Sequence, residues 1–127
     1  MIAEQLSFLG VIDEKEVRKT VVTELKKYRA LKVQLENKKE CIDVGVIGLF
    51  PSLRKQDNFN ELRVKQLERA LENGLDAIEK EIIKKKYLDL QEMNDLNIYL
   101  ELGLKKDMYY MKKRSAILNL ATALGMI

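Results

Sequence analysis

Residues 94–120, NDLNIYLELGLKKDMYYMKKRSAILNL, contain the pattern that decides the predicted fold. Asn94 can cap a short helix that has Tyr99 on its apolar face. Gly103 then permits a sharp turn of the backbone, and Leu104, the apolar residue just after it, pins the turn before a longer helix begins. This order predicts a helix, a tight turn and a second helix, which is the order that a helix-turn-helix requires.

The second helix has one apolar side and one polar side. Five apolar residues fall within about a third of the helical wheel: Tyr109, Ala116, Ile117, Leu120 and Leu124. Asp107, Met111 and Arg114 point the other way. We therefore expect Tyr109 to belong to the core rather than to an outward binding surface, whereas the pattern leaves the place of Tyr110 open.

Positive charge is concentrated around this second helix. From Gly103 to the end of the chain there are five Lys or Arg residues and one acidic residue, a net charge of +4, whereas the whole chain carries +3. Three more lysines, residues 84–86, lie on the preceding predicted helix. Basic side chains gathered on one candidate recognition helix are the electrostatic footprint of binding to a phosphate backbone; for any single lysine, a solvated charged face is the alternative.

The geometry of a recognition helix divides these side chains into two predicted roles. Its N-terminal part faces the base edges in the major groove, where Arg or Lys suits guanine and Asp suits the amino group of cytosine. The predicted base-reading residues are Lys106, Asp107, Tyr110, Met111 and Arg114. The predicted phosphate contacts are Lys84, Lys85, Lys86, Lys105, Lys112 and Lys113. Double-stranded DNA is the partner that this set of residues predicts.

Before this region the sequence predicts a helical arm and a linker. Asp13 followed by Glu16 is a capping-box pattern, and apolar residues then recur at three- and four-residue steps, which predicts one long helix over residues 14–40. Glu24 interrupts a near-heptad stripe, so the helix packs either on a partner helix or on its own domain. Residues 42–58 hold two glycines, the only proline and several apolar side chains, which are expected to dock rather than stay free.

After the linker the helical period returns at Asn60. Asn73 with Gly74 is a stop signal of the kind in which the glycine turns left-handed. Asp76 with Glu79 forms a second capping box and opens another helix. The apolar residues of that helix are Ile78, Ile82, Ile83 and Tyr87.

The composition agrees with one small helical protein. The chain of 127 residues suffices for one domain with a core, or for a small domain with an arm. The predicted fold class is all-α, with a helical arm over residues 1–41, a linker over residues 42–59 and a helix-turn-helix domain over residues 60–127.

The same composition argues against an enzyme. There is no histidine, and Cys41 is the only cysteine, so we expect no internal disulfide, no structural metal and no His-dependent nucleophile. No glycine-rich phosphate loop is present either, and no cofactor is expected. No apolar run approaches the roughly 20 residues that cross a bilayer, and the N-terminus lacks the features of a signal peptide, so a cytoplasmic protein without a membrane partner is expected.

Several segments together resemble a known family. They are VRKTVVTELKKYRALK (17–32), AIEKEIIKKKYLD (77–89), NDLNIYLELGL (94–104), YYMKKRSAI (109–117) and LATALGMI (120–127). In these segments the chain resembles the ArpU-like regulators of phages and prophages, which are similar in their C-terminal half to region four of primary sigma factors. The family generally has a serine or a similar cap two residues after the turn glycine, where this chain has Lys105.

The resemblance implies a DNA-binding activator of phage late genes, such as packaging and lysis genes, that acts in the cytoplasm of a bacterial host cell. Two alternatives remain: a sigma-like module whose main partner is RNA polymerase, and a helical protein–protein interaction protein that does not bind DNA. A homodimer is also expected, because the C-terminal segment SAILNLATALGMI is apolar on nearly every side of a helix. Leu118 in this segment needs cover from either the N-terminal arm or a second subunit.

Overall fold

The computed structural model describes residues 13–53 and 59–127. Over these residues the protein is all-helical and contains no strand, which confirms the all-α prediction. Residues 1–12 of the predicted arm and residues 54–58 of the predicted linker lie outside the described residues. The elements are α2 (Glu14–Asp43), α3 (Asn60–Asn73), α4 (Ala77–Ile83), the π-helical turn η1 (Lys84–Leu88), α5 (Asp95–Glu101) and α6 (Lys106–Ala123).

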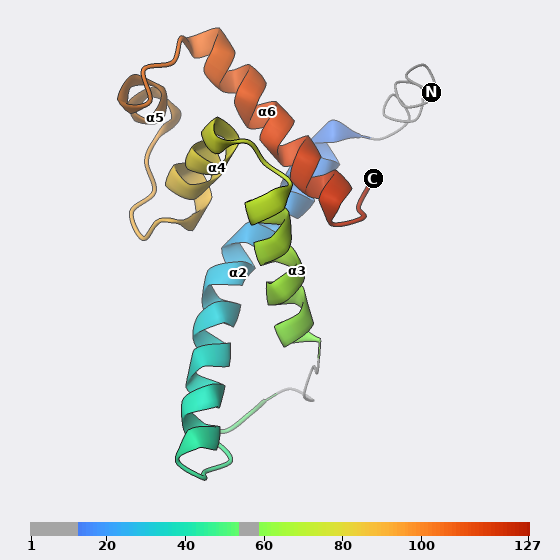
Figure 1. Cartoon of the computed structure of the whole chain (residues 1–127), viewed down its shortest axis with the longest axis vertical. Helices are drawn as coiled ribbons and strands as arrows, with labels where there is room; N and C mark the ends of the chain where they lie inside the picture. Colours follow the sequence, from blue (N-terminus) through green and yellow to red (C-terminus); the bar gives the residue numbers. More distant parts are fainter. Residues whose placement is uncertain (1–12, 54–58) are drawn as a thin grey trace.

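The long helix α2 forms the axis of the molecule (Figure 1). α3 packs beside α2, and α6 crosses the N-terminal part of α2 at the upper end. α4 and α5 lie along α6 and complete the upper part of the molecule. The loop that follows α2 lies at the lower end, far from α5 and α6.

The predicted long N-terminal helix is confirmed, and it runs slightly further than expected. Asp13 caps it by accepting a hydrogen bond from the backbone N–H of Lys15 at 2.9 Å, whereas the capping-box pattern points to Glu16. The helix continues to Asp43 rather than ending at residue 40.

The arm and the C-terminal helices share the larger hydrophobic core. Its buried residues come from every described helix except α5 and from Leu75, which connects α3 to α4: Val17, Val21, Leu25, Leu67, Ala70, Leu75, Ile83, Tyr87, Ala116, Ile117, Leu120 and Ala121. Leu118 is partly buried against this core. Leu118 is therefore partly covered within the chain by the shared core, and α2 packs on its own domain.

A second, smaller core holds α5 in place. Its centre is formed by one fully buried residue from each of three helices, namely Ile82 of α4, Ile98 of α5 and Tyr109 of α6. The residues around this centre are Met93, Tyr99, Leu102 and Leu104. A small number of side chains thus fixes how α5 and α6 lie relative to each other.

α4 is fastened to α6 through a buried carboxylate. The predicted capping box is present, because Asp76 accepts from the N–H of Glu79 at 2.8 Å and Glu79 accepts from the N–H of Asp76 at 2.9 Å. The second oxygen of Glu79 accepts hydrogen bonds from Ser115 (2.8 Å) and Asn119 (3.0 Å) of α6. Glu79 is 3% exposed, and these bonds offset the cost of removing its carboxylate from water.

Two local predictions near α4 are wrong. Gly74 does not turn left-handed, since its φ is −93°. Glycine is needed there for space, because a Cβ would lie 2.6 Å from the carbonyl oxygen of Ala70. Ile78, expected on the apolar face of α4, is 40% exposed, whereas Ile82 and Ile83 are fully buried. The apolar side of α4 is therefore narrower than its sequence suggests.

The apolar residues of the linker do not dock against the described part of the protein, contrary to the expectation. Seven large side chains within residues 42–53 are exposed, and we call them the apolar tip: Ile42, Val44, Val46, Ile47, Leu49, Phe50 and Leu53. Ile42 lies in the last turn of α2, and the other six residues come after that helix. This part of the chain is at the lower end of the molecule in Figure 1. Their exposed fractions range from 39% for Val46 to 105% for Ile47.

Candidate nucleic-acid interface

A tight turn joins α5 to α6. Gly103 has a φ of 69°, in the left-handed region that glycine adopts without strain. The N–H of Leu104 donates to the carbonyl of Tyr99 at 2.9 Å, and the N–H of Leu102 donates to the carbonyl of Ile98 at 2.9 Å. These bonds satisfy carbonyl groups at the end of α5 before the chain enters α6. Backbone hydrogen bonds and the second core therefore set the direction of α6 together.

The start of α6 has no side-chain cap among the described residues. Lys105 occupies the N-cap position, and its side chain cannot accept a hydrogen bond from the first backbone N–H groups. Asp107 is the acidic residue of the first turn. The positive end of the helix dipole thus lies beside the charges of Lys105 and Lys106. An approaching anion such as a phosphate would offset the repulsion between the positive helix end and these two lysines.

The predicted base-reading residues lie together on one exposed face of α6. All five are exposed: Lys106, Asp107, Tyr110, Met111 and Arg114. Tyr109, which precedes Tyr110, is fully buried, which confirms its prediction as a core residue. The N-terminal part of α6 therefore presents charged, aromatic and thioether side chains outward while Tyr109 fixes its inner side.

Asp95, in the first turn of α5, gathers two of the predicted phosphate contacts. Its Oδ1 accepts the phenolic O–H of Tyr109 at 2.5 Å and an N–H of Lys113 at 3.0 Å, and the Nζ of Lys86 lies 3.6 Å away. Burial acts to raise the pKa of Asp95, but the hydrogen bonds from Tyr109 and Lys113 outweigh it and hold the pKa below its ordinary value. Burial, reinforced by Asp95, raises the pKa of Tyr109, so the phenol keeps the proton that it donates.

Two further predicted phosphate contacts are paired with carboxylates outside α6 and η1. Lys85 donates to Glu101 of α5 at 2.7 Å, and Lys112 donates to Asp76, the N-cap of α4, at 2.7 Å. The hydrogen bond from Lys112 holds the pKa of Asp76 below its ordinary value. Asp76 therefore caps one helix and pairs with a lysine of another.

Arg114 reaches from α6 to the first turn of α2. Its Nε donates to one carboxylate oxygen of Glu14 at 2.9 Å, and its Nη2 donates to the other at 2.5 Å. This two-point bond holds the pKa of Glu14 below its ordinary value. The side chain of Arg114 is 65% exposed, so an incoming anion or base has access to it.

The sequence predictions name the basic residues of this surface but not their acidic partners. Glu14, Asp76 and Asp95 stand at the starts of α2, α4 and α5, where acidic residues stabilise a helix. The position of an acidic residue at a helix start can be predicted from the local sequence. That these three residues come together around α6 depends on the tertiary fold and cannot be predicted in this way. Of the predicted basic DNA contacts, three make no ion pair with any described residue: Lys84, Lys105 and Lys106.

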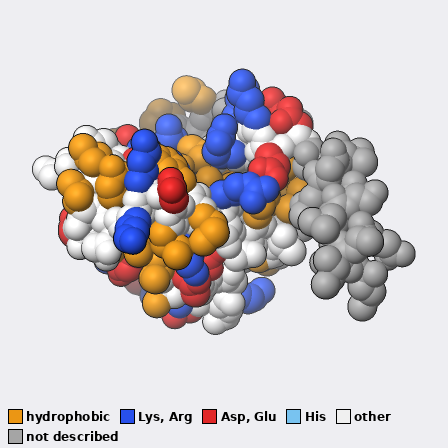
Figure 2. Space-filling view, turned by 90° about the horizontal axis from the view of Figure 1, so that it is seen from above, with side chains coloured by type: hydrophobic (Ala, Val, Ile, Leu, Met, Phe, Trp, Pro, Cys, Tyr) orange, Lys and Arg blue, Asp and Glu red, His pale blue; other side chains and the backbone are white. Residues whose placement is uncertain are grey.

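The surface seen from above the start of α6 carries charges of both signs (Figure 2). Lys and Arg side chains lie among acidic and hydrophobic ones, and the basic groups in this view do not merge into one continuous patch. The basic footprint expected from the sequence is thus interrupted by carboxylates. A phosphate that binds here must compete with them for several of the lysines.

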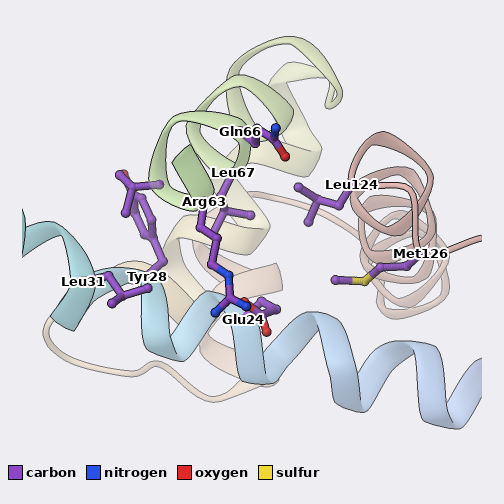
Figure 3. A pocket seen from close by; sticks show the side chains of 9 residues that line it. Glu24, Tyr28, Leu31, Arg63, Gln66, Leu67, Leu124 and Met126 are labelled. Atoms are coloured by element: carbon purple, nitrogen blue, oxygen red, sulfur yellow. The ribbon is translucent and has the colours of Figure 1, made fainter. Parts of the chain in front are cut away.

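A small groove lies elsewhere, between α2, α3 and the C-terminal residues (Figure 3). Its volume is about 210 Å³, and it is lined by Glu24, Tyr28, Leu31, Arg63, Val64, Gln66, Leu67, Leu124 and Met126. Small-molecule sites usually measure about 300–1,000 Å³, so this groove falls below their range. Within residues 13–53 and 59–127, no group of three or more His, Cys, Asp or Glu side chains could hold a metal ion. No helix in those ranges has the length and apolarity needed to cross a membrane.

The geometry of α6 and the motifs of the sequence are the basis on which a function can be assigned. Comparisons of the chain with protein families, with curated proteins and with solved structures found no match.

Proposed function

We propose that this protein binds double-stranded DNA sequence-specifically and regulates transcription, with the exposed face of α6 lying in the major groove. The observation that carries the proposal is that face, where Lys106, Asp107, Tyr110, Met111 and Arg114 project from a helix anchored on its other side. A guanidinium suits guanine, a carboxylate suits the amino group of cytosine, and an apolar side chain suits the methyl group of thymine.

Basic side chains without a carboxylate partner support the proposal. Lys84 and Lys105 make no ion pair with a described residue, and the start of α6 offers backbone N–H groups without a side-chain cap. Contacts of this kind fix the register of a recognition helix on the duplex without reading its sequence. The tight turn at Gly103 then serves to hold α5 across the backbone while α6 enters the groove.

The resemblance to ArpU-like regulators extends the proposal to a class of genes. On that basis α4, α5 and α6 form a helix-turn-helix similar to sigma region four, and the protein activates phage or prophage late genes in a bacterial host cell. This chain departs from the family at Lys105, because the family generally has a capping residue there, whereas α6 begins without a side-chain cap.

Selection from a pool of random duplexes tests DNA binding without knowledge of the operator. We expect one family of sequences to be enriched, and the enriched duplex to bind more tightly than its scrambled version. Arg114→Ala should reduce this difference, and Arg18→Ala, on α2, is the matched control. Absence of binding to any duplex at low salt would reject the proposal, and binding without enrichment would reject sequence specificity.

The ion pairs favour a second candidate, a helical interaction protein that does not bind DNA. Four of the lysines predicted to contact phosphates already have carboxylate partners: Lys85, Lys86, Lys112 and Lys113. Exposed Leu96 and Leu100 on α5 also give a protein partner an apolar surface to bury. Absence of DNA selection would favour this candidate, whereas binding of purified RNA polymerase that is lost in Leu96→Ser with Leu100→Ser would favour the other alternative, a sigma-like module that acts through RNA polymerase.

A further inference from the structure

The apolar tip exposes large hydrophobic side chains without any intramolecular cover among the described residues. Ile47, Phe50 and Leu53 are 105%, 88% and 97% exposed, so they make almost no contact within the chain. Single exposed apolar side chains are ordinary on a protein surface, but a contiguous group of this size marks an interaction site. The tip therefore needs a partner that removes it from water.

The area of the tip is comparable to what a stable protein–protein contact buries on one partner. Burial of one Val, Leu, Ile or Phe side chain removes about 60–120 Å² from water, so seven such side chains offer roughly 400–800 Å². A standard interface buries about 800 Å² on each partner. The tip thus supplies between half and all of one partner's share, and the polar residues around it can form the rim.

Charge favours a second copy of the same chain over a membrane surface as the partner. Asp43 is the only charged residue within 42–53, so two tips can meet with little like-charge repulsion. With the adjoining residues on both sides included (36–58), four basic residues are balanced by four acidic ones: Lys38, Lys39, Arg54 and Lys55 against Glu36, Glu40, Asp43 and Asp57. Attraction to anionic lipid requires an excess of basic residues, which this end of the molecule lacks.

The position of the tip is compatible with pairing. It lies at the opposite end of α2 from α5 and α6, so contact there leaves the exposed face of α6 free (Figure 1). Leu118, the residue whose exposure would have placed a subunit contact at the end of α6, is instead packed against the shared core. We infer that two copies of this chain form a homodimer by isologous contact of their apolar tips about a two-fold axis.

Sedimentation equilibrium of the full chain tests this dimer. The wild type is expected to be dimeric at tens of micromolar, and Ile47→Ser with Phe50→Ser to be monomeric. Because both side chains are exposed in the monomer, the circular dichroism of the variant should not change. Its urea midpoint should equal that of the wild type at concentrations where both are monomeric, whereas the wild type should gain stability as the concentration rises. Leu96→Ser with Leu100→Ser, which removes exposed apolar side chains from α5, is the matched control and should remain dimeric.

Cys41 provides a second readout that places the contact. It is the only cysteine, so a nitroxide attached to it reports distances between copies alone. Because Cys41 directly precedes the tip, we expect a dipolar coupling between two labels that is lost on dilution with unlabelled protein and in the Ile47→Ser, Phe50→Ser variant.

Three results would overturn the inference. A monomeric wild type at tens of micromolar would do so, and its sedimentation with phosphatidylserine vesicles would then assign the tip to a lipid surface. A dimer that survives the tip substitutions would place the contact elsewhere. Since the dimer does not depend on DNA, a monomer that still selects one DNA sequence would remove the dimer and leave the proposed function standing.

Discussion

The phenolic O–H of Tyr109 donates a hydrogen bond to Oδ1 of Asp95 across 2.5 Å, and Lys113 donates to the same oxygen. The bond joins the first turn of α5 to the buried side of α6. One carboxylate thus orients α6 and neutralises a lysine that the same helix would offer to a phosphate. The orientation of α6 and the charge that Lys113 can offer to a phosphate therefore depend on the same carboxylate, that of Asp95.

Tyr109→Phe is expected to lower the free energy of unfolding by about 1–2 kcal/mol, because it removes a hydrogen bond to a carboxylate while keeping the ring in the core. Urea unfolding measures the change. Tyr110→Phe is the control, since that ring is 43% exposed, and a change within about 0.5 kcal/mol is expected. Equal effects of the two substitutions would contradict a structural role for the bond.

Gly103→Ala is expected to destabilise the protein by about 1–2 kcal/mol, because an alanine would have to adopt a φ of 69°. Space is not the cause, since no atom lies within 4 Å of the Cβ position. Gly48→Ala also meets open space but does not have a positive φ, so thermal and urea unfolding should show little change. An unchanged midpoint in Gly103→Ala would show that the turn can adopt another conformation.

Acid is expected to destabilise the protein in a defined pH range. The pKa values of Glu14, Asp76 and Asp95 lie below their ordinary values of 4.5, 3.8 and 3.8, so the folded protein binds protons less tightly there than the unfolded chain. Their contribution to stability is present above the ordinary values and is lost as the pH falls through the lowered ones.

Urea unfolding at a series of pH values checks this effect. Asp76→Asn should flatten the acid limb, because asparagine can still cap α4 but no longer titrates. A stability that stays constant as the pH falls below the ordinary values would show that the ion pairs contribute nothing.

DNA binding is expected to depend strongly on salt. Lys84→Ala with Lys105→Ala should weaken binding to all duplexes alike and reduce the slope of log K against log salt concentration by about two. Lys38→Ala with Lys39→Ala, on α2 near the apolar tip, removes the same charge at the other end of the molecule and should leave the slope unchanged. Equal loss of slope in both variants would mean that net charge, and not the α6 surface, binds DNA.

Glu14→Gln is expected to strengthen binding to the selected duplex about two- to five-fold, because Arg114 no longer has to leave a carboxylate before it reads a base. Glu16→Gln, in the same first turn of α2, carries the same charge change without a bond to Arg114. Fluorescence anisotropy measures the affinity of both variants for the selected and the scrambled duplex. A gain that is equal in both variants would reflect only the lost negative charge.

The elements that the sequence predicts correctly depend on local signals. The turn at Gly103, the capping box of Asp76 with Glu79 and the burial of Tyr109 each follow from residues a few positions apart. Gly74 shows the limit of such signals, because a glycine is required either for a left-handed φ or for a close approach, and the sequence does not distinguish them.

The elements that the sequence does not predict depend on long-range packing. Glu14 and Arg114 are 100 residues apart, and only the crossing of α2 and α6 brings them together. The same crossing forms part of the core against which Leu118 is partly buried. The basic residues of the candidate interface were therefore predictable as types and positions, whereas the extent to which carboxylates neutralise them was not.

The π-helical turn η1 holds one residue more than an α turn would. The N–H of Asp89 donates to the carbonyl of Lys84, five residues earlier, and Tyr87 lies buried in the larger core. A deletion of one residue here would let the segment close as a regular α turn, so the residues before and after it would keep their faces. In related chains, the loss of one residue at this turn should therefore be tolerated, whereas a deletion inside α6 would rotate the rest of that helix by about 100°.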